Sequence, residues 1–211
     1  MTVATDDRPS KIASMAVQTS ADRFITIKGD WAHFKLIQKG CEQNSGTRLF
    51  YFDGTIEILM TGRSHELFSH LIGNLLSFFL AYQGIDFFPF GTADQEKEGI
   101  AASQPDQSYC FGTVKPIPDL SIEVVFTSGG VAKLQRYKAI GVPEVWFWED
   151  GTLTLYHLRG EEYERIEKSE LEELKDLDVS ILKRHIMMGE TKVGEAIRSF
   201  TAYILETQVR R

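Results

Sequence analysis

Two carboxylates and a lysine near the middle of the chain have the types and spacing that phosphodiester chemistry needs. Glu123 lies inside the apolar run 120–126, Asp106 follows Pro105 at the start of another apolar segment, and Lys133 follows a Gly-Gly turn. A carboxylate within an apolar strand is costly unless a metal, a basic side chain or hydrogen bonds compensate it. The alternative for Glu123 is a structural ion pair or a place at the edge of a sheet.

The spacing of β-strands selects the partner of Glu123. Asp119 lies four residues before it on the same predicted strand, and four residues of strand span about 13 Å, which is too far for two ligands of one ion. Asp106 starts a different strand, and a neighbouring strand lies only about 5 Å away. Asp106 and Glu123 are therefore predicted to hold Mg²⁺ or Mn²⁺ together with water and phosphate. Asp119 is predicted to cap or position its strand.

Three further residues are candidates for this site, each with a structural alternative. Lys133 comes ten residues after Glu123, at the start of a helix that can fold back toward the end of the strand. Its ammonium group would stabilise charge on the reacting phosphate and orient the attacking water; the alternative is an ordinary surface lysine. Glu57 lies on the outward-facing or cleft-facing side of its strand, opposite Ile56 and Ile58, where a lone acid is usually solvated. His65 lies at the N-terminus of a helix, where it could face a cleft or assist in capping.

Apolar patterns predict the elements that position these residues. Arg48 to Met60 reads as a hairpin with an Asp53-Gly54 turn, and a second hairpin turns at Asp150-Gly151. Further strands are predicted over 85–92, 107–111, 120–126 and 144–148, and helices over 31–43, 64–82, 131–140 and 190–206. The continuous apolar strand 120–126 is typical of α/β sheets covered on both faces. We expect a flexible tail over 1–22 and a single domain over 23–211.

Bulk properties restrict the class of protein. The chain has 211 residues, a formal charge of -7 and two cysteines without metal-ligand spacing. The acidic charge argues against non-specific coating of nucleic acid, although a metal ion can offset an acidic centre. No signal peptide is visible, and the apolar run 71–81 is about half the length that spans a bilayer. We therefore expect a cytoplasmic protein that is not embedded in a membrane.

Six motifs, in this order, carry a family resemblance. They are Gly54-Thr55-Ile56-Glu57-Ile58-Leu59-Met60, Ser64-His65-Glu66, Gln104-Pro105-Asp106, Pro118-Asp119-Leu120-Ser121-Ile122-Glu123-Val124, Lys133-Leu134-x-x-Tyr137 and Gly141-Val142-Pro143-Glu144-Val145-Trp146. The chain resembles, over about 24–200, the Uma-type family of bacterial restriction endonucleases. That family, long treated as a domain of unknown function, is placed in the PD-(D/E)XK nuclease superfamily.

The resemblance implies a restriction-endonuclease-like mixed β-sheet flanked by helices. Asp106 and Glu123 match the two acids of the superfamily motif. The superfamily lysine normally lies two residues after the second acid, where this chain has Val125. Lys133 matches a lysine that has moved to the following helix, and Glu57 matches a frequent extra acid near the metal.

The expected function is a Mg²⁺-dependent or Mn²⁺-dependent DNA endonuclease. A homodimer is expected because cutting both strands of a duplex needs two sites. Valine at position 125 and the acidic charge favour a second hypothesis, a catalytically inactive nuclease fold that acts in binding or regulation. A metal-dependent hydrolase of another phosphate ester is a third.

Overall fold

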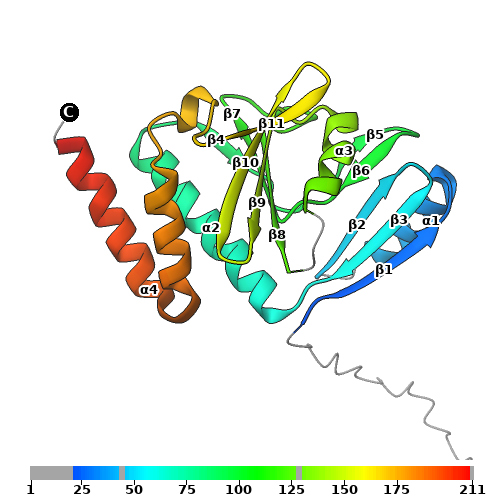
Figure 1. The fold of residues 1–211 in the computed structure, drawn as a ribbon, viewed down its shortest axis with the longest axis horizontal. Helices are drawn as coiled ribbons and strands as arrows, with labels where there is room; N and C mark the ends of the chain where they lie inside the picture. Colours follow the sequence, from blue (N-terminus) through cyan, green and yellow to red (C-terminus); the bar gives the residue numbers. More distant parts are fainter. Residues whose placement is uncertain (1–20, 43–45, 127–129, 210–211) are drawn as a thin grey trace, which may run out of the picture.

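The computed structural model describes residues 21–42, 46–126 and 130–209. In these residues the chain forms two β-sheets and their flanking helices (Figure 1). The predicted tail therefore falls outside the described residues, except for Ala21 and Asp22.

A six-stranded sheet forms the centre of the molecule. Its strands are β4 (Phe87–Pro89), β7 (Gln107–Phe111), β8 (Leu120–Val125), β9 (Glu144–Glu149), β10 (Thr152–Arg159) and β11 (Glu162–Ile166). They stand in the order β11-β10-β9-β8-β7-β4. All neighbouring pairs are antiparallel except β8 with β9, which is parallel. The predicted mixed sheet is thus confirmed.

A second sheet of five antiparallel strands lies beside the first. Its strands are β1 (Arg23–Lys28), β2 (Thr47–Phe52), β3 (Thr55–Met60), β5 (Gln95–Lys97) and β6 (Ala101–Ser103), in the order β1-β3-β2-β6-β5. The β2–β3 hairpin turns at Asp53-Gly54, as predicted, with φ of 47° and 64°. Such positive values are those of the hairpin turn that Asp-Gly favours.

The helices cover both faces of the central sheet. They are α1 (Trp31–Cys41), α2 (Arg63–Tyr82), α3 (Gly130–Ile140) and α4 (Val179–Val209). Helices α2 and α4 pack on one face, α3 lies between the two sheets, and α1 packs on the outside of the five-stranded sheet (Figure 1). No helix in the described parts of the chain has the length and apolarity to cross a membrane.

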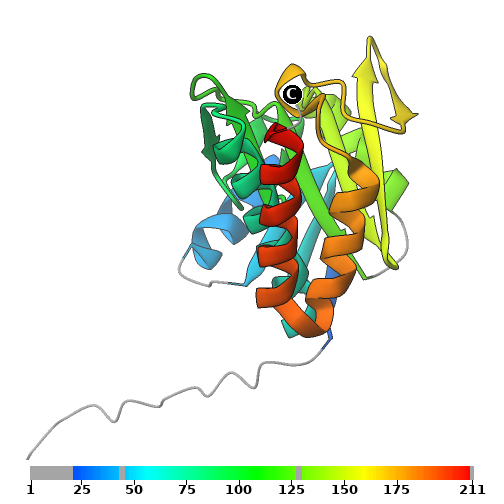
Figure 2. The same cartoon turned by 90° about the vertical axis from the view of Figure 1, so that its left-hand side faces the viewer.

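Helix α4 is two helical segments that meet at a reversal of the chain. Lys192 has non-helical backbone angles, φ -139° and ψ 61°. Figure 2 shows the two segments, orange and red, running side by side in opposite directions. The predicted final helix over 190–206 corresponds to the second segment, and the first segment, which begins at Val179, was not predicted.

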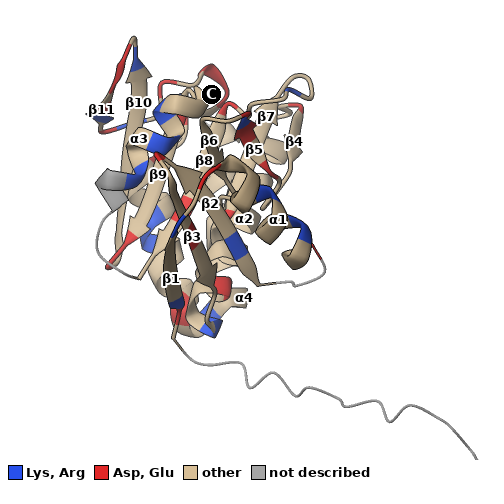
Figure 3. Cartoon of the chain, turned by 90° about the vertical axis from the view of Figure 1, so that its right-hand side faces the viewer, with Lys and Arg blue, Asp and Glu red and all other residues tan. Residues whose placement is uncertain are grey.

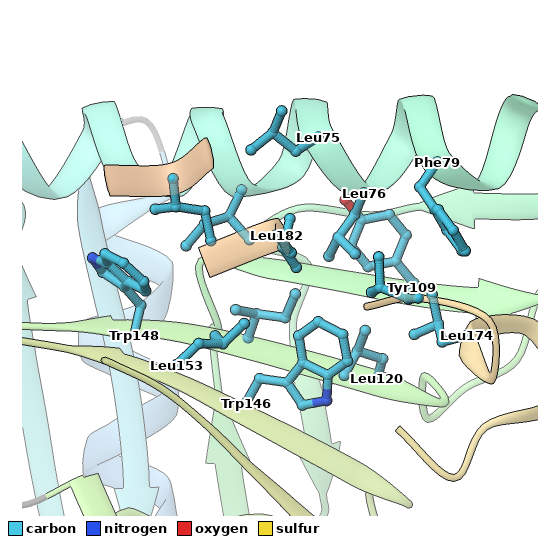
Figure 4. Close-up of a cluster of buried hydrophobic side chains, with 14 of the residues drawn as sticks. Leu75, Leu76, Phe79, Tyr109, Leu120, Trp146, Trp148, Leu153, Leu174 and Leu182 are labelled. Atoms are coloured by element: carbon cyan, nitrogen blue, oxygen red, sulfur yellow. The ribbon is translucent and has the colours of Figure 1, made fainter. Parts of the chain in front are cut away.

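The main hydrophobic core lies between the six-stranded sheet and helices α2 and α4. Figure 4 shows Leu75, Leu76 and Phe79 of α2 above Trp146 and Trp148 of β9. Strand β8 contributes alternate side chains to this core, namely those of Leu120, Ile122 and Val124. Because strand side chains alternate, Glu123 points to the opposite face, toward α3 and the second sheet.

Four strands depart from the prediction. Strand β1 was not predicted, β5 and β6 lie in a stretch predicted as a loop, and β4 is only the centre of the predicted strand 85–92. The sequence of β6, Ala-Ala-Ser, has weak strand propensity, and pairing with β2 and β5 imposes its extended conformation.

Packing between α2 and α4 gives a testable prediction. A Cβ added at the buried Gly189 would lie 2.1 Å from Cδ2 of Leu71, itself in the core. We expect Gly189→Ala to lower the free energy of unfolding by about 1–3 kcal/mol, because overpacking forces neighbouring atoms apart. Urea unfolding measures this change.

Gly194→Ala, on the same helix, is the matched control. The nearest atom to its added Cβ is the end of the Arg198 side chain, at 3.2 Å. Alanine is favoured over glycine in helices by up to about 1 kcal/mol, so this variant should be as stable as the wild type or slightly more stable. Equal stability of the two variants would contradict the packing argument.

Candidate functional site

Asp106 directly precedes β7, and Glu123 lies within the neighbouring strand β8. The pairing of β7 with β8 sets Gln107 against Ile122, at the end of the ladder and next in sequence to both acids. The N–H of Asp106 donates to the carbonyl of the same Ile122 at 3.0 Å, so the alignment shifts by one residue at this point. Asp106 and Glu123 are almost fully buried, with exposures of 4% and 2%. Each carboxylate therefore needs compensation within the protein.

The Asp106 cluster comprises Asp106, Arg48, His65 and Asp22. The Nε2 of His65 lies 2.7 Å from Asp106 Oδ1, and the N–H of Val124 donates to Asp106 Oδ2 at 2.8 Å. The Nε of Arg48 lies 3.6 Å from Asp106 Oδ1, within ion-pair distance. One cation from α2 and one from β2 thus face this carboxylate.

His65 is held between two carboxylates. Its Nδ1 lies 2.8 Å from Asp22, whose other oxygen accepts from the N–H of Gly62 at 2.7 Å. A neutral imidazole has only one N–H, so donation to both carboxylates requires the protonated ring. Burial opposes this protonation, but hydrogen bonds and charges from Asp106 and Asp22 outweigh it and raise the pKa of His65 to about 9. Burial likewise opposes ionisation of Asp22, while His65 and Gly62 bring its pKa below the usual value.

The Glu123 cluster comprises Glu123, Lys133, Arg136, Tyr137 and Glu57. Lys133 Nζ donates to Glu123 Oε2 at 2.7 Å. Arg136 Nη2 donates to Oε1 at 3.2 Å, and the Tyr137 hydroxyl donates to the same oxygen. Burial disfavours the charged carboxylate, but the charges of Lys133 and Arg136, with hydrogen bonds from Lys133 and Tyr137, lower the pKa of Glu123 to about 2.

Arg136 links Glu123 to Glu57. Its Nη1 donates to Glu57 Oε2 at 2.9 Å, so one guanidinium bridges acids of two different sheets. The three donors of α3, Lys133, Arg136 and Tyr137, are spaced i, i+3 and i+4, which places them on one helix face. This spacing was visible in the sequence, yet only Lys133 was assigned a role from it.

Other predicted residues occupy structural positions. Val125, at the superfamily lysine position, is buried in the apolar cluster formed with α3 and β9. Asp119 accepts from the N–H of Phe111 at 2.8 Å and pairs with Lys115, so it fixes the connection that leads into β8.

Sequence reasoning gave no role to Asp22, Arg48 or Arg136. Asp22 fell within the predicted tail, but its side chain is buried and bound to His65 and Gly62. Arg48 and Arg136 are buried basic residues, and each ends beside an acid that is distant in sequence. The contacts of His65 with Asp22 and Asp106 could not be seen in the sequence, because the three segments meet only in the folded chain.

The oxygen donors of Asp106 and Glu123 fit a hard divalent cation. Mg²⁺ is commonly bound by one or two carboxylates and completes its coordination with water and substrate phosphate. A carboxylate has about four acceptor positions. Asp106 accepts two hydrogen bonds and Glu123 three, which leaves acceptor capacity on both. Within the described ranges, no three His, Cys, Asp or Glu side chains converge as one metal group, so this is at most a two-carboxylate set.

Charge is nearly balanced across the two clusters and the adjoining Glu66. The acids are Asp22, Glu57, Glu66, Asp106 and Glu123, and the cations are Arg48, His65, Lys133 and Arg136. With His65 protonated, one net negative charge remains. A divalent cation would reverse it, which suits a centre that receives a phosphodiester anion.

A family model matches residues 31–182, about seven tenths of the chain, under the description "Putative restriction endonuclease". The chain belongs to the Uma2 family. No curated protein matches it.

The Uma2 match contains most of the site but not all of it. It covers Glu57, His65, Asp106, Glu123 and Lys133, and it begins after β1. The restriction-endonuclease description agrees with the mixed sheet flanked by helices. Asp22 lies outside the matched segment, so its contact with His65 is a feature that the structure adds to the Uma2 match.

The pKa of His65 predicts how stability changes with pH. A folded-state pKa of about 9, above the ordinary 6.5, means that protonated His65 stabilises the fold. This contribution is fully present below about pH 6.5 and is lost as the pH rises through about 9. Its size is on the order of 3 kcal/mol. Urea unfolding of the metal-free wild type between pH 6.5 and 9 should show this decrease.

Two variants separate His65 from other titrating groups. His65→Gln should show a much smaller decrease over the same range, because glutamine does not titrate. His70→Gln, which changes an exposed histidine on the same helix, should keep the wild-type slope. Equal slopes for His65→Gln and the wild type would refute the assignment.

Proposed function

We propose that this protein is a metal-dependent DNA endonuclease whose centre is formed by Asp106 and Glu123. The observation that carries the proposal is the pair of buried carboxylates on adjacent strands with Lys133 Nζ 2.7 Å from the second of them. Membership of a family described as restriction endonucleases supports DNA, rather than another phosphate ester, as the substrate.

Asp106 and Glu123 would hold Mg²⁺ or Mn²⁺. Such an ion supplies neutralisation of the scissile phosphate and lowers the pKa of a bound water. The chain's own residues fix the two carboxylates before any ion arrives. His65 and the N–H of Val124 orient Asp106, and Arg136 with Tyr137 orients Glu123.

Lys133 would supply positive charge at the reacting phosphate. In hydrolysis the oxygen of water bonds to phosphorus, the bond from phosphorus to one sugar oxygen breaks, the water loses a proton to solvent, and the leaving oxygen gains one. Negative charge grows on the phosphate oxygens during this step, and a fixed ammonium group stabilises it. Lys133 comes from α3 and compensates for Val125, which is buried where the superfamily lysine usually lies.

DNA would be drawn to the centre by local charge rather than by the whole surface. The chain carries a net charge of -7, and Figure 3 shows basic and acidic segments interspersed on the side that bears β1, β2 and β3. Binding should therefore depend strongly on divalent cation and less on a broad basic surface.

Plasmid cleavage tests the proposal. With Mg²⁺ or Mn²⁺, purified protein should convert supercoiled plasmid to nicked or linear DNA, and chelator should abolish the reaction. Asp106→Asn should lower the cleavage rate by at least about 100-fold, because the ion loses a charged ligand. The matched control is Asp119→Asn, the other Pro-Asp aspartate, which should stay close to the wild-type rate. Cleavage that persists in Asp106→Asn would refute the assignment.

The form of the cleaved plasmid, nicked or linear, also tests the proposed homodimer. Two sites working together give linear DNA early in the reaction, whereas a single site gives nicked circles first. Linear product whose rate rises with the square of protein concentration would support a dimer as the cutting unit.

Lys133 has its own prediction. Lys133→Met should lower the cleavage rate by about 100-fold or more with little change in DNA affinity, since its charge acts mainly in the transition state. Lys133→Arg keeps the charge and should recover part of the rate. An unchanged rate in Lys133→Met would exclude the lysine from the reaction, whatever the effect of Asp106→Asn.

The second candidate function is binding without cleavage. Its support is that Glu123 already accepts three hydrogen bonds and that valine occupies position 125. In that case the wild type would leave plasmid intact, and its melting temperature would not respond to a Mg²⁺ or Mn²⁺ series.

A further inference from the structure

We infer that Arg136 serves as a fixed internal cation between Glu57 and Glu123, so that the centre takes one divalent cation and Glu57 is not a ligand of it. The inference rests on the proposed function, since it concerns the same metal centre. It assigns a positioning role to Arg136. It also makes Glu57, which the family resemblance placed near the metal, a partner of Arg136 instead of a metal ligand.

The contacts of Arg136 leave its guanidinium little freedom. Only 4% of its side chain is exposed, Nη1 and Nη2 bind acids of different sheets, and the guanidinium carbon lies 4.1 Å from the centre of the Phe50 ring. Phe50 and Glu57 are paired across β2 and β3, so one sheet supplies both the stacking surface and one of the acids. A guanidinium that stacks on an aromatic ring and bridges two carboxylates is a well-ordered cation.

Arg136 also limits which oxygen of Glu123 can bind metal. Oε1 accepts from both Arg136 and Tyr137, which fills its two acceptor positions, whereas Oε2 accepts only from Lys133. Glu123 therefore offers a single position, on Oε2. A two-metal centre needs carboxylates that can serve ions about 4 Å apart, and the guanidinium occupies the oxygens that would serve the second ion.

Glu57 is directed toward Arg136 rather than toward Asp106. Its Oε2 is bound to Arg136, and about a quarter of its side chain is exposed, unlike those of Asp106 and Glu123. It neutralises Arg136, and Arg136 in turn holds Glu123. An acceptor oxygen at position 57 holds the guanidinium in place, and it does so without touching the ion.

Mn²⁺ binding tests the inference without an activity assay. Full-length protein is titrated with Mn²⁺, free ion is measured by electron paramagnetic resonance, and the number of bound ions and the Kd are fitted. The wild type should bind one ion, and Asp106→Asn should lose it. Glu57→Gln should still bind one ion with a Kd within about threefold of wild type, because the glutamine amide oxygen can still accept from Arg136 and keep Glu123 oriented, whereas loss of a metal ligand costs more than about tenfold.

Arg136 variants test the exclusion of a second ion. Arg136→Met frees both carboxylates and should bind two ions. Arg136→Lys keeps the charge and should bind one, and the double variant Arg136→Met with Glu57→Gln should return to one. Circular dichroism confirms that each variant is folded; if Arg136→Met is unfolded, Glu57→Gln alone decides.

The outcomes separate this inference from the proposed function. Two ions in the wild type, a Glu57→Gln Kd raised more than about tenfold, or one ion in folded Arg136→Met would overturn the inference while leaving metal-dependent cleavage intact. If the wild type binds one Mn²⁺ but does not cleave DNA, the inference about Arg136 stands and the proposed endonuclease function is refuted. A wild type that binds no Mn²⁺ overturns both.

Discussion

The need to compensate two buried carboxylates governs the organisation of this protein. Asp106 and Glu123 sit in the interior beside an apolar sheet, where an uncompensated charge would be prohibitively unstable. Each carboxylate has its own set of donors, His65 with a backbone N–H for Asp106, and Lys133, Arg136 and Tyr137 for Glu123. Donors and acids come from both sheets and from helices α2 and α3, so the centre and the packing of the layers are mutually dependent.

The donors around Asp106 and Glu123 neutralise both carboxylates without filling all of their acceptor positions. Removing one member of a buried ion-pair network leaves an unpaired buried charge, which is strongly destabilising. Here the oxygens of Asp106 and Glu123 also retain acceptor positions, and the surrounding groups carry one net negative charge. The same residues therefore hold the fold together and keep the free oxygen positions that the proposed metal centre requires.

The two clusters differ in what supports them. The Asp106 cluster depends on Asp22, which precedes β1 and lies outside the part of the chain that matches the Uma2 model. The Glu123 cluster depends on α3, whose Lys133, Arg136 and Tyr137 share one face. Val125 packs in the core, since the lysine beside Glu123 comes from α3 rather than from β8. Lys133 thus brings a positive charge beside Glu123 from the helix that follows the strand.

The sequence by itself determined the local elements and the principal acids. Asp-Gly turns, the apolar runs of β8 and β9 and the periodicity of α2 are encoded within short windows, and strand spacing singled out Asp106 over Asp119. Only the tertiary structure decided the partners of those acids. Glu57 and Arg136 are 79 residues apart, and Asp22 and His65 are 43 apart. Periodicity records which face of an element is buried, but an ion pair between two sheets depends on how the sheets pack, and no local pattern carries that information.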